Sequence, residues 1–268
     1  MNPTSIPDEF AEAFAQARPR LGPLAARVLW YDEITSTNDR ALAWAESGAE
    51  EGCLVLADAQ TSGRGRLGRA WASPAGAGIY ASTVLRPPAH AVGLLTMAAG
   101  LAVSEGIASA TGLDAYVKWP NDVCMPGRPP RKLAGILAEA GSTGGRVLHV
   151  VVGIGINVLP GAYPPAVAAR ATSLEAELGR AVQRSTVLAE CLAALWRRYS
   201  MLGAGEAGAV LADWRRRAAS TFGRRVEWDT PAGSRTGIAR DVDASGALVV
   251  ATDSGLVRLT AGEVRWTE

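Results

Sequence analysis

Two long apolar segments near the middle of the chain are separated by a short glycine-rich turn. The first is KLAGILAEA (132–140), the second is RVLHVVVGIGINV (146–158), and AGSTGG lies between them. Two such segments joined by a turn of Gly and Ser are typical of an antiparallel β-hairpin. The hairpin argues against a doubly wound parallel sheet and favours an α+β fold with a mixed, largely antiparallel sheet and helices.

Shorter strands and helices surround this hairpin. We expect strands at 28–34, 53–60, 79–87 and 115–123, and helices at 8–18, 36–48, 91–110, 166–178, 184–201 and 206–219. After residue 219 the pattern changes to about five short segments separated by Gly or Asp turns, which predicts a small β-barrel. We therefore divide the chain into a loosely attached, proline-rich N-terminal leader (1–27), a main domain (28–219) and a C-terminal domain (220–268).

Composition excludes several classes of function. The formal net charge of +1 provides no global basic field for nucleic-acid binding. With only His90 and His149, a Ser-His-Asp hydrolase or a multi-histidine metal enzyme is not expected. Cys53, Cys124 and Cys191 form no CxxC pair, which fits a reduced, cytoplasmic compartment. No apolar run reaches about 18 residues, so we expect no membrane span.

The most unusual stretch is the loop Gly63-Arg64-Gly65-Arg66-Leu67-Gly68-Arg69. It satisfies G-x-G-x-x-G, but the dinucleotide-binding fingerprint requires a helix directly afterwards and an acid about 20 residues on. Here a strand follows, and no Asp or Glu occurs between Asp58 and Glu105. Three arginines among three glycines instead favour an anion-binding loop that closes over a ligand. A solvated basic loop that contacts nucleic acid is the alternative interpretation.

Three further segments place polar side chains at strand ends. Lys118-Trp119-Pro120-Asn121-Asp122 ends one strand, Lys132 begins the next, and Gly153-Ile154-Gly155-Ile156-Asn157 ends a third. Each segment alone also suits an ordinary turn or ion pair, and Trp71 and Trp119 suit plain core packing equally well. Together the segments predict a binding site at the strand ends.

Over about residues 30–160 the chain contains, in this order, Ser36-Thr37-Asn38, Gln60-Thr61-Ser62, GRGRLGRAW, KWPNDV, RKLAGILAE and GIGINV. These segments and their order resemble the biotin–protein ligase family. The resemblance implies a core like that of class II aminoacyl-tRNA synthetases and an SH3-like C-terminal barrel. It implies that biotin and ATP form biotinyl-5′-AMP, and that biotin is then transferred to a lysine of a biotin carboxyl carrier domain.

The resemblance also implies roles for individual residues. Biotin is expected to contact Ser36, Thr37, Asn38, Gln60, Gly63, Arg64, Gly65, Arg66 and Lys132. ATP and the adenylate are expected to contact Arg66, Arg69, Trp71, Asn121, Lys132 and Asn157. Lys132 and Arg66 are the expected catalytic residues, and Asp122 is the expected ligand of Mg²⁺.

Alternatives remain within and outside this family. A lipoate ligase or octanoyltransferase shares the core fold, and a non-catalytic nucleic-acid-binding module would also use a basic loop. Some family members carry an N-terminal winged helix-turn-helix, for which the first 27 residues are too few and too rich in proline. We therefore expect a ligase without DNA-binding activity, as a monomer or a weak homodimer.

Overall fold

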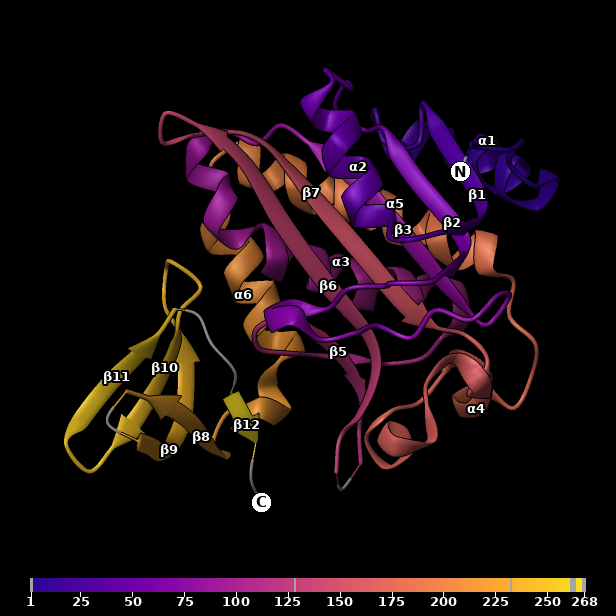
Figure 1. Ribbon diagram of the computed structural model, residues 1–268. Helices are drawn as coiled ribbons and strands as arrows, with labels where there is room; N and C mark the ends of the chain where they lie inside the picture. Colours follow the sequence, from indigo (N-terminus) through magenta and orange to yellow (C-terminus); the bar gives the residue numbers. More distant parts are fainter. Residues whose placement is uncertain (1, 128, 232, 261–263, 267–268) are drawn as a thin grey trace.

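The computed structural model describes residues 2–127, 129–231, 233–260 and 264–266. A seven-stranded sheet with helices forms the main body, and a smaller five-stranded sheet near the C-terminus lies beside it (Figure 1).

The large sheet is mixed and mainly antiparallel, as expected. Its strands are β1 (Val28–Ile34), β2 (Leu54–Gln60), β3 (Gly78–Leu85), β4 (Tyr116–Lys118), β5 (Asp122–Met125), β6 (Arg131–Thr143) and β7 (Arg146–Asn157), in the order β1-β2-β3-β7-β6-β5-β4. Among the described strands only β1 and β2 pair in parallel, and helix α2 (Thr37–Glu46) connects them. The predicted hairpin is the β6–β7 pair, which confirms the fold class.

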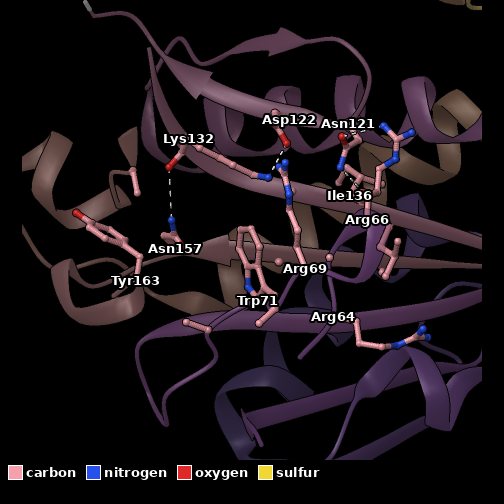
Figure 2. Close-up of a pocket in the computed structure, with 18 of the residues that line it drawn as sticks. Arg64, Arg66, Arg69, Trp71, Asn121, Asp122, Lys132, Ile136, Asn157 and Tyr163 are labelled. Atoms are coloured by element: carbon pink, nitrogen blue, oxygen red, sulfur yellow. Dashed lines mark hydrogen bonds and ion pairs between the residues drawn. The ribbon is translucent and has the colours of Figure 1, made fainter. Parts of the chain in front are cut away.

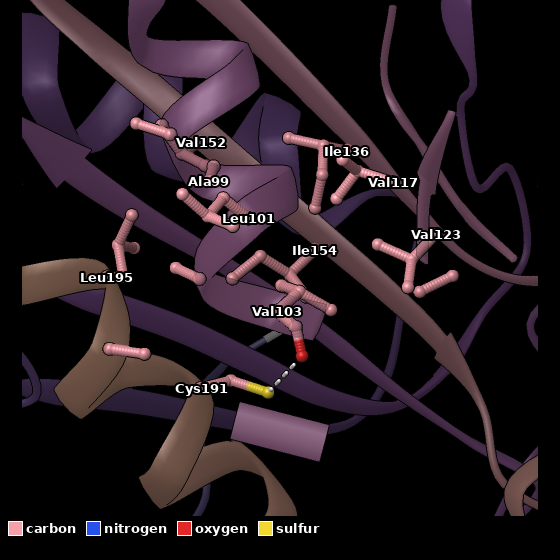
Figure 3. Close-up of a cluster of buried hydrophobic side chains, with 14 of the residues drawn as sticks. Ala99, Leu101, Val103, Val117, Val123, Ile136, Val152, Ile154, Cys191 and Leu195 are labelled. Carbon is pink, nitrogen blue, oxygen red and sulfur yellow. Dashed lines mark hydrogen bonds between the residues drawn. The ribbon is translucent and has the colours of Figure 1, made fainter. Parts of the chain in front are cut away.

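Helices on one face of the sheet build the main core. These are α1 (Asp8–Leu21), α3 (Leu95–Thr111), α5 (Arg184–Gly203) and α6 (Ala207–Arg217). Figure 3 shows Val103 of α3 between Ile154 of the sheet and Cys191 of α5. A Cβ atom on Gly106 would lie only 2.5 Å from the Cα atom of Cys191, so this glycine allows α3 and α5 to pack closely.

The central helix α3 is mostly apolar and lies inside this layer, and its Glu105 pairs with Arg197 of α5. Together with the turn η2 (Ala89–Leu94), it is long and apolar enough to cross a membrane by length and composition alone. Most of it is buried against the sheet and α5, as in the core helix of a globular fold.

The N-terminal segment is packed into the core, so the expected loose attachment of the leader is wrong. Phe10, Phe14 and Leu21 of α1 are buried, and the ring centroid of Phe10 lies 5.4 Å from that of Trp30. The apolar face of this helix outweighs its prolines, because Pro7 precedes the helix and Pro19 lies in its last turn.

The helix expected at 166–178 is interrupted. The chain forms the short turn η4 (Pro165–Arg170) and the five-residue helix α4 (Leu174–Leu178). Between them Ala171 forms a bridge with Lys132, and the Thr172 amide donates to the Lys132 carbonyl at 2.9 Å. Pairing with β6 therefore replaces helical hydrogen bonds at this point.

The C-terminal unit has the five predicted strands. They are β8 (Arg225–Thr230), β9 (Gly233–Val242), β10 (Leu248–Thr252), β11 (Gly255–Leu259) and β12 (Val264–Trp266), and in the described residues they form an open antiparallel sheet in the order β11-β10-β9-β8-β12. This sheet is attached to the main body where the Trp119 indole donates to the Gly246 carbonyl at 2.9 Å. Arg215 of α6 also pairs with Asp241 of β9 at 2.7 Å.

Replacement of Leu21 by alanine tests whether the N-terminal helix belongs to the core. We expect a loss of about 2–5 kcal/mol in the free energy of unfolding, because a fully buried leucine leaves a cavity. Gln16→Ala, on the exposed side of the same helix, should change this free energy by less than about 0.5 kcal/mol. Urea denaturation measures both free energies. Equal losses in the two variants would indicate that the helix is only loosely attached.

Candidate functional site

A cavity of about 670 Å³ opens beside the polar ends of the central strands. Side chains alternate across a sheet, so Ile136 and Ile154 enter the helical core while their neighbours face the cavity. On this face of β3, β6 and β7, the residues that line the cavity are Tyr80, Gly135, Leu137, Gly153, Gly155 and Asn157. Ser82 and Glu139 lie on the same face, beyond the cavity lining. Helix α2 covers the rest of that face, packing near Val84 and Val151.

Three glycines form a floor without side chains. A Cβ atom on Gly155 would lie 2.6 Å from Cε2 of Trp71, and one on Gly135 would lie 3.0 Å from Cζ3 of the same ring. At Gly153 it would lie 2.1 Å from Oδ1 of Asn38. The glycines of GIGIN and KLAGI therefore make room for Trp71 and Asn38, both of which line the cavity.

One end of the cavity is a compact network of neutral polar groups. The backbone amide and the hydroxyl of Thr37 both donate to Oε1 of Gln60, at 2.8 and 3.1 Å. The Gln60 amide donates in turn to Ser73 Oγ at 2.8 Å. Ser82 Oγ donates to Asn38 Oδ1 at 2.6 Å. Ser36 caps helix α2 by accepting from the Asp39 amide, which fixes the Ser-Thr-Asn segment at the helix start.

The Gly/Arg loop forms a narrow hairpin along the cavity. Gly65 donates to the Arg69 carbonyl at 2.7 Å, and Trp71 donates to the Gly63 carbonyl at 2.8 Å. Between them the turn η1 (Arg66–Gly68) places Leu67 at the tip, in the left-handed region and exposed. A side chain at Gly63 would meet the Trp71 carbonyl at 2.4 Å, so only glycine allows the two sides of the hairpin to approach.

Charged groups gather at the other end of the cavity (Figure 2). Lys132 Nζ lies 2.6 Å from Asp122 Oδ1 and 5.2 Å from the centroid of the Trp71 ring. Arg66 donates to Asn121 Oδ1 at 3.3 Å, and Asn121 donates to the Ile136 carbonyl at 2.9 Å. Burial lowers the pKa of the Arg66 guanidinium, and the nearby Asp122 charge partly offsets this decrease. Arginine nevertheless remains cationic at neutral pH.

The predicted site residues come together in this one cavity. Its lining includes Ser36, Thr37, Asn38, Gln60, Arg64, Gly65, Arg66, Arg69, Trp71, Asn121, Asp122, Lys132 and Asn157. Gly63 is outside the lining and packs against the Trp71 carbonyl at the base of the loop hairpin. Their individual roles stay predictions. The amide of Asn157 is buried and donates to the Thr172 carbonyl at 2.9 Å, which ties β7 to the chain beside β6.

Two tryptophans have different positions. Trp71 lies on the glycine floor of the cavity. Trp119 also touches the cavity, but its side chain is buried in the core beside the C-terminal sheet, in line with the core-packing interpretation. Lys118 and Lys132 are the two lysines of the chain, and both line the cavity.

Sequence reasoning missed several residues at this site. Arg265 and Trp266 of β12 line the cavity, and Lys118 Nζ lies 6.0 Å from the Trp266 ring centroid. No local signal identifies them, because they come from the far end of the chain. Glu139 carried a usable signal, since it lies four residues after Gly135 on the same strand and therefore faces the same side.

The arrangement can hold a molecule with two unlike ends. Buried donors and acceptors suit a neutral polar group, and the opposite end supplies cations for carboxylate or phosphate oxygens. Between them the indole of Trp71 provides an apolar surface.

Comparisons with known proteins give consistent results. Residues 30–157 match the model of the Biotin/lipoate A/B protein ligase family, and residues 221–265 match the Biotin protein ligase C terminal domain. The biotin–[acetyl-CoA-carboxylase] ligase of Mycobacterium tuberculosis is 39% identical over 244 residues, covering 85% of this chain and 85% of that protein. The bifunctional ligase/repressor BirA of Bacillus subtilis is 33% identical over 245 residues, covering 90% of this chain and 74% of that protein.

A solved structure agrees with these relatives. Biotin protein ligase from Aquifex aeolicus in complex with biotin and ATP superposes with a TM-score of 0.74 at 29% sequence identity. The match covers 90% of this chain and 99% of that one.

The glycine floor can be tested by one methyl group. Gly155→Ala should displace the Trp71 ring and lower the free energy of unfolding by about 1–3 kcal/mol, because the new carbon overlaps the indole. Gly161→Ala is the matched control, since no atom lies within 4 Å of its added carbon. Urea denaturation and a crystal structure of each variant would show the difference; an undisturbed Trp71 in the Gly155 variant would contradict the packing argument.

Proposed function

Because this chain belongs to the biotin protein ligase family and is an ATP-using biotin ligase, we propose how its own residues divide the work between binding and chemistry. The observation that carries the proposal is the union, in one cavity, of a neutral polar end at Thr37 and Gln60 with a cationic end at Arg66 and Lys132. The ureido ring of biotin, which offers two N–H donors and a carbonyl, fits the first end, and phosphate oxygens fit the second.

The first step joins two anions. A carboxylate oxygen of biotin attacks the α-phosphorus of ATP, the bond to the bridging oxygen breaks, and pyrophosphate leaves with that electron pair. Carboxylate and polyphosphate repel each other, so the site must supply fixed positive charge where they meet. We propose that Lys132 bridges the carboxylate and the α-phosphate and that Arg66 and Arg69 close over the phosphate, because all three line this cavity.

Ligand binding changes the partner of Lys132. In the structure its ammonium is paired with Asp122 at 2.6 Å, which keeps the cation in place and oriented. Phosphate oxygens would take over part of that contact, and Asp122 would then be available for Mg²⁺.

A divalent cation fits here only together with the substrate's phosphates. Asp122 is the single carboxylate among the described residues that line the cavity, and the described part of the chain has no cluster of three or more His, Cys, Asp or Glu side chains. Mg²⁺ commonly binds through one or two carboxylates together with phosphate oxygens, so this donor set suits it. When bound, the ion spreads the negative charge of the phosphates.

The second step delivers biotin to protein. The amine of a carrier lysine attacks the carbonyl carbon of the mixed anhydride, the acyl–phosphate bond breaks, and AMP leaves. We propose that the acceptor is a biotin carboxyl carrier domain of a carboxylase, in the cytoplasm. We also propose that residues 28–219 carry the chemistry and that residues 220–268 close one side of the site through Arg265 and Trp266.

The direct test is biotin-dependent exchange of labelled pyrophosphate into ATP, followed by transfer to an apo carrier domain and detection with streptavidin. We expect both activities. Transfer of lipoate without transfer of biotin would favour the lipoate ligase alternative, and absence of exchange would overturn the proposed chemistry.

Lys132→Ala should lower the rate of exchange by about 10²- to 10³-fold, the usual effect of removing one preorganised charge from an active site. Arg180→Ala, an exposed residue outside the cavity, removes the same charge and should leave exchange unchanged. Both should melt close to the wild type. Pyrophosphate exchange at the wild-type rate in the Lys132 variant would contradict a role for Lys132 in adenylate formation.

A further inference from the structure

Arg64 differs from the other arginines of the Gly/Arg loop in where its charge lies. Its Nη2 atom is 2.6 Å from Asp39 Oδ1 and 2.6 Å from Glu139 Oε2. Figure 2 shows the side chain directed away from Lys132 and Asp122. The guanidinium therefore joins the first strand of the loop hairpin to helix α2 and to β6, two elements of the main body.

Glu139 is shared between the loop and the polar end of the cavity. The same oxygen, Oε2, accepts from Arg64 at 2.6 Å and from Asn38 Nδ2 at 2.8 Å. Asn38 is buried, and its own Oδ1 accepts from Ser82 at 2.6 Å. The position of one carboxylate thus sets both the position of Arg64 and the orientation of the Asn38 amide.

The network continues to the other end of the loop. Ser82 Oγ contacts Thr37 Oγ1 at 2.8 Å, Thr37 donates to Gln60, and Gln60 donates to Ser73. Ser73 in turn donates to the Trp71 carbonyl at 3.1 Å, where the loop hairpin ends. Both ends of the loop are therefore connected by hydrogen bonds that run through the neutral polar end of the cavity.

We propose that Glu139 is a positioning residue that latches the Gly63–Trp71 loop over the adenylate and couples this closure to occupancy of the biotin-ring pocket through Asn38. The inference rests on the proposed function and adds a residue and a coupling to it. A ligand that hydrogen-bonds Asn38 stiffens the amide that holds Glu139, and Glu139 then holds Arg64 more firmly. Arg64 acts here as part of the latch, and Arg66, Arg69 and Lys132 supply the charge that faces phosphate.

The test measures how long the adenylate stays bound. Enzyme is loaded with radiolabelled biotin and ATP, desalted, and the label retained is followed with time in the presence of a lysine-rich bystander protein. Glu139→Gln keeps an oxygen that can accept from Asn38 but removes the charge that pairs with Arg64. We expect adenylate release about fivefold faster, matching the loss of a partly exposed charged pair, with a raised KM for biotin and unchanged kcat for transfer to the carrier.

Two further variants separate the latch from a general loss of charge. Asp39→Asn removes the more exposed partner of Arg64. Among the described contacts, the Asn38 side chain bonds Glu139 and not the Asp39 carboxylate, so release should quicken slightly while the KM for biotin stays unchanged. Glu33→Gln, an exposed carboxylate on β1 that does not line the cavity, should change neither quantity. Equal KM values for biotin in the Glu139 and Asp39 variants would contradict the coupling.

Arg64→Gln completes a double-mutant cycle. If Glu139 acts through Arg64, adding Glu139→Gln to Arg64→Gln should quicken adenylate release little further. Fully additive effects, or release from Glu139→Gln at the wild-type rate, would overturn the latch. Arg64→Gln alone still tests the latch should the Glu139 variant fail to fold. Failure of the wild type to exchange pyrophosphate is a different result, which would overturn the proposed function itself.

Discussion

The cross-strand pairing of Gly135 with Gly155 in β6 and β7 is the contact around which the site is arranged. Because neither residue has a side chain, the indole of Trp71 can lie directly on the sheet. The residues next to them, Ile136 and Ile154, point to the opposite side and pack against α3. The same two strands therefore form the floor of the cavity and the wall of the core, so a rigid, close-packed layer supports the site.

Charges in the cavity are largely compensated by internal partners. Lys132 is paired with Asp122, and Arg64 is paired with Asp39 and Glu139. Cations held in this way are preorganised, so little rearrangement is needed when substrate oxygens arrive. The neutral end is organised similarly, because Thr37 already donates to Gln60 and Gln60 already donates to Ser73.

The sequence was most informative where the signal is local. Two apolar segments around a turn of Gly and Ser predicted the β6–β7 hairpin, because that signal lies in neighbouring residues. The family resemblance named residues that line the cavity, and their individual roles stay predictions. The interrupted helix before Leu174 was missed, since its break depends on pairing with Lys132, about forty residues away. The packing of α1 and the approach of Trp266 depend on contacts with still more distant segments.

Orientation of side chains was also beyond sequence reasoning. The sequence alone does not distinguish the three arginines of the loop. In the structure Arg64 pairs with two carboxylates, whereas Arg66 donates to Asn121. A strand position such as Glu139 can be assigned to a face by counting residues, but its partner on another element cannot.

The distribution of primary amines has a chemical consequence of its own. A mixed anhydride acylates uncharged amines. The primary amines of this chain are those of Lys118, Lys132 and the N-terminus. Every other basic side chain apart from histidine is a guanidinium, which is a poor nucleophile. The side chain of Lys132 is also paired with Asp122 at 2.6 Å, inside the cavity. The protein is thus a poor target for its own activated product, and molecules of that product that escape would modify other proteins in preference to this one.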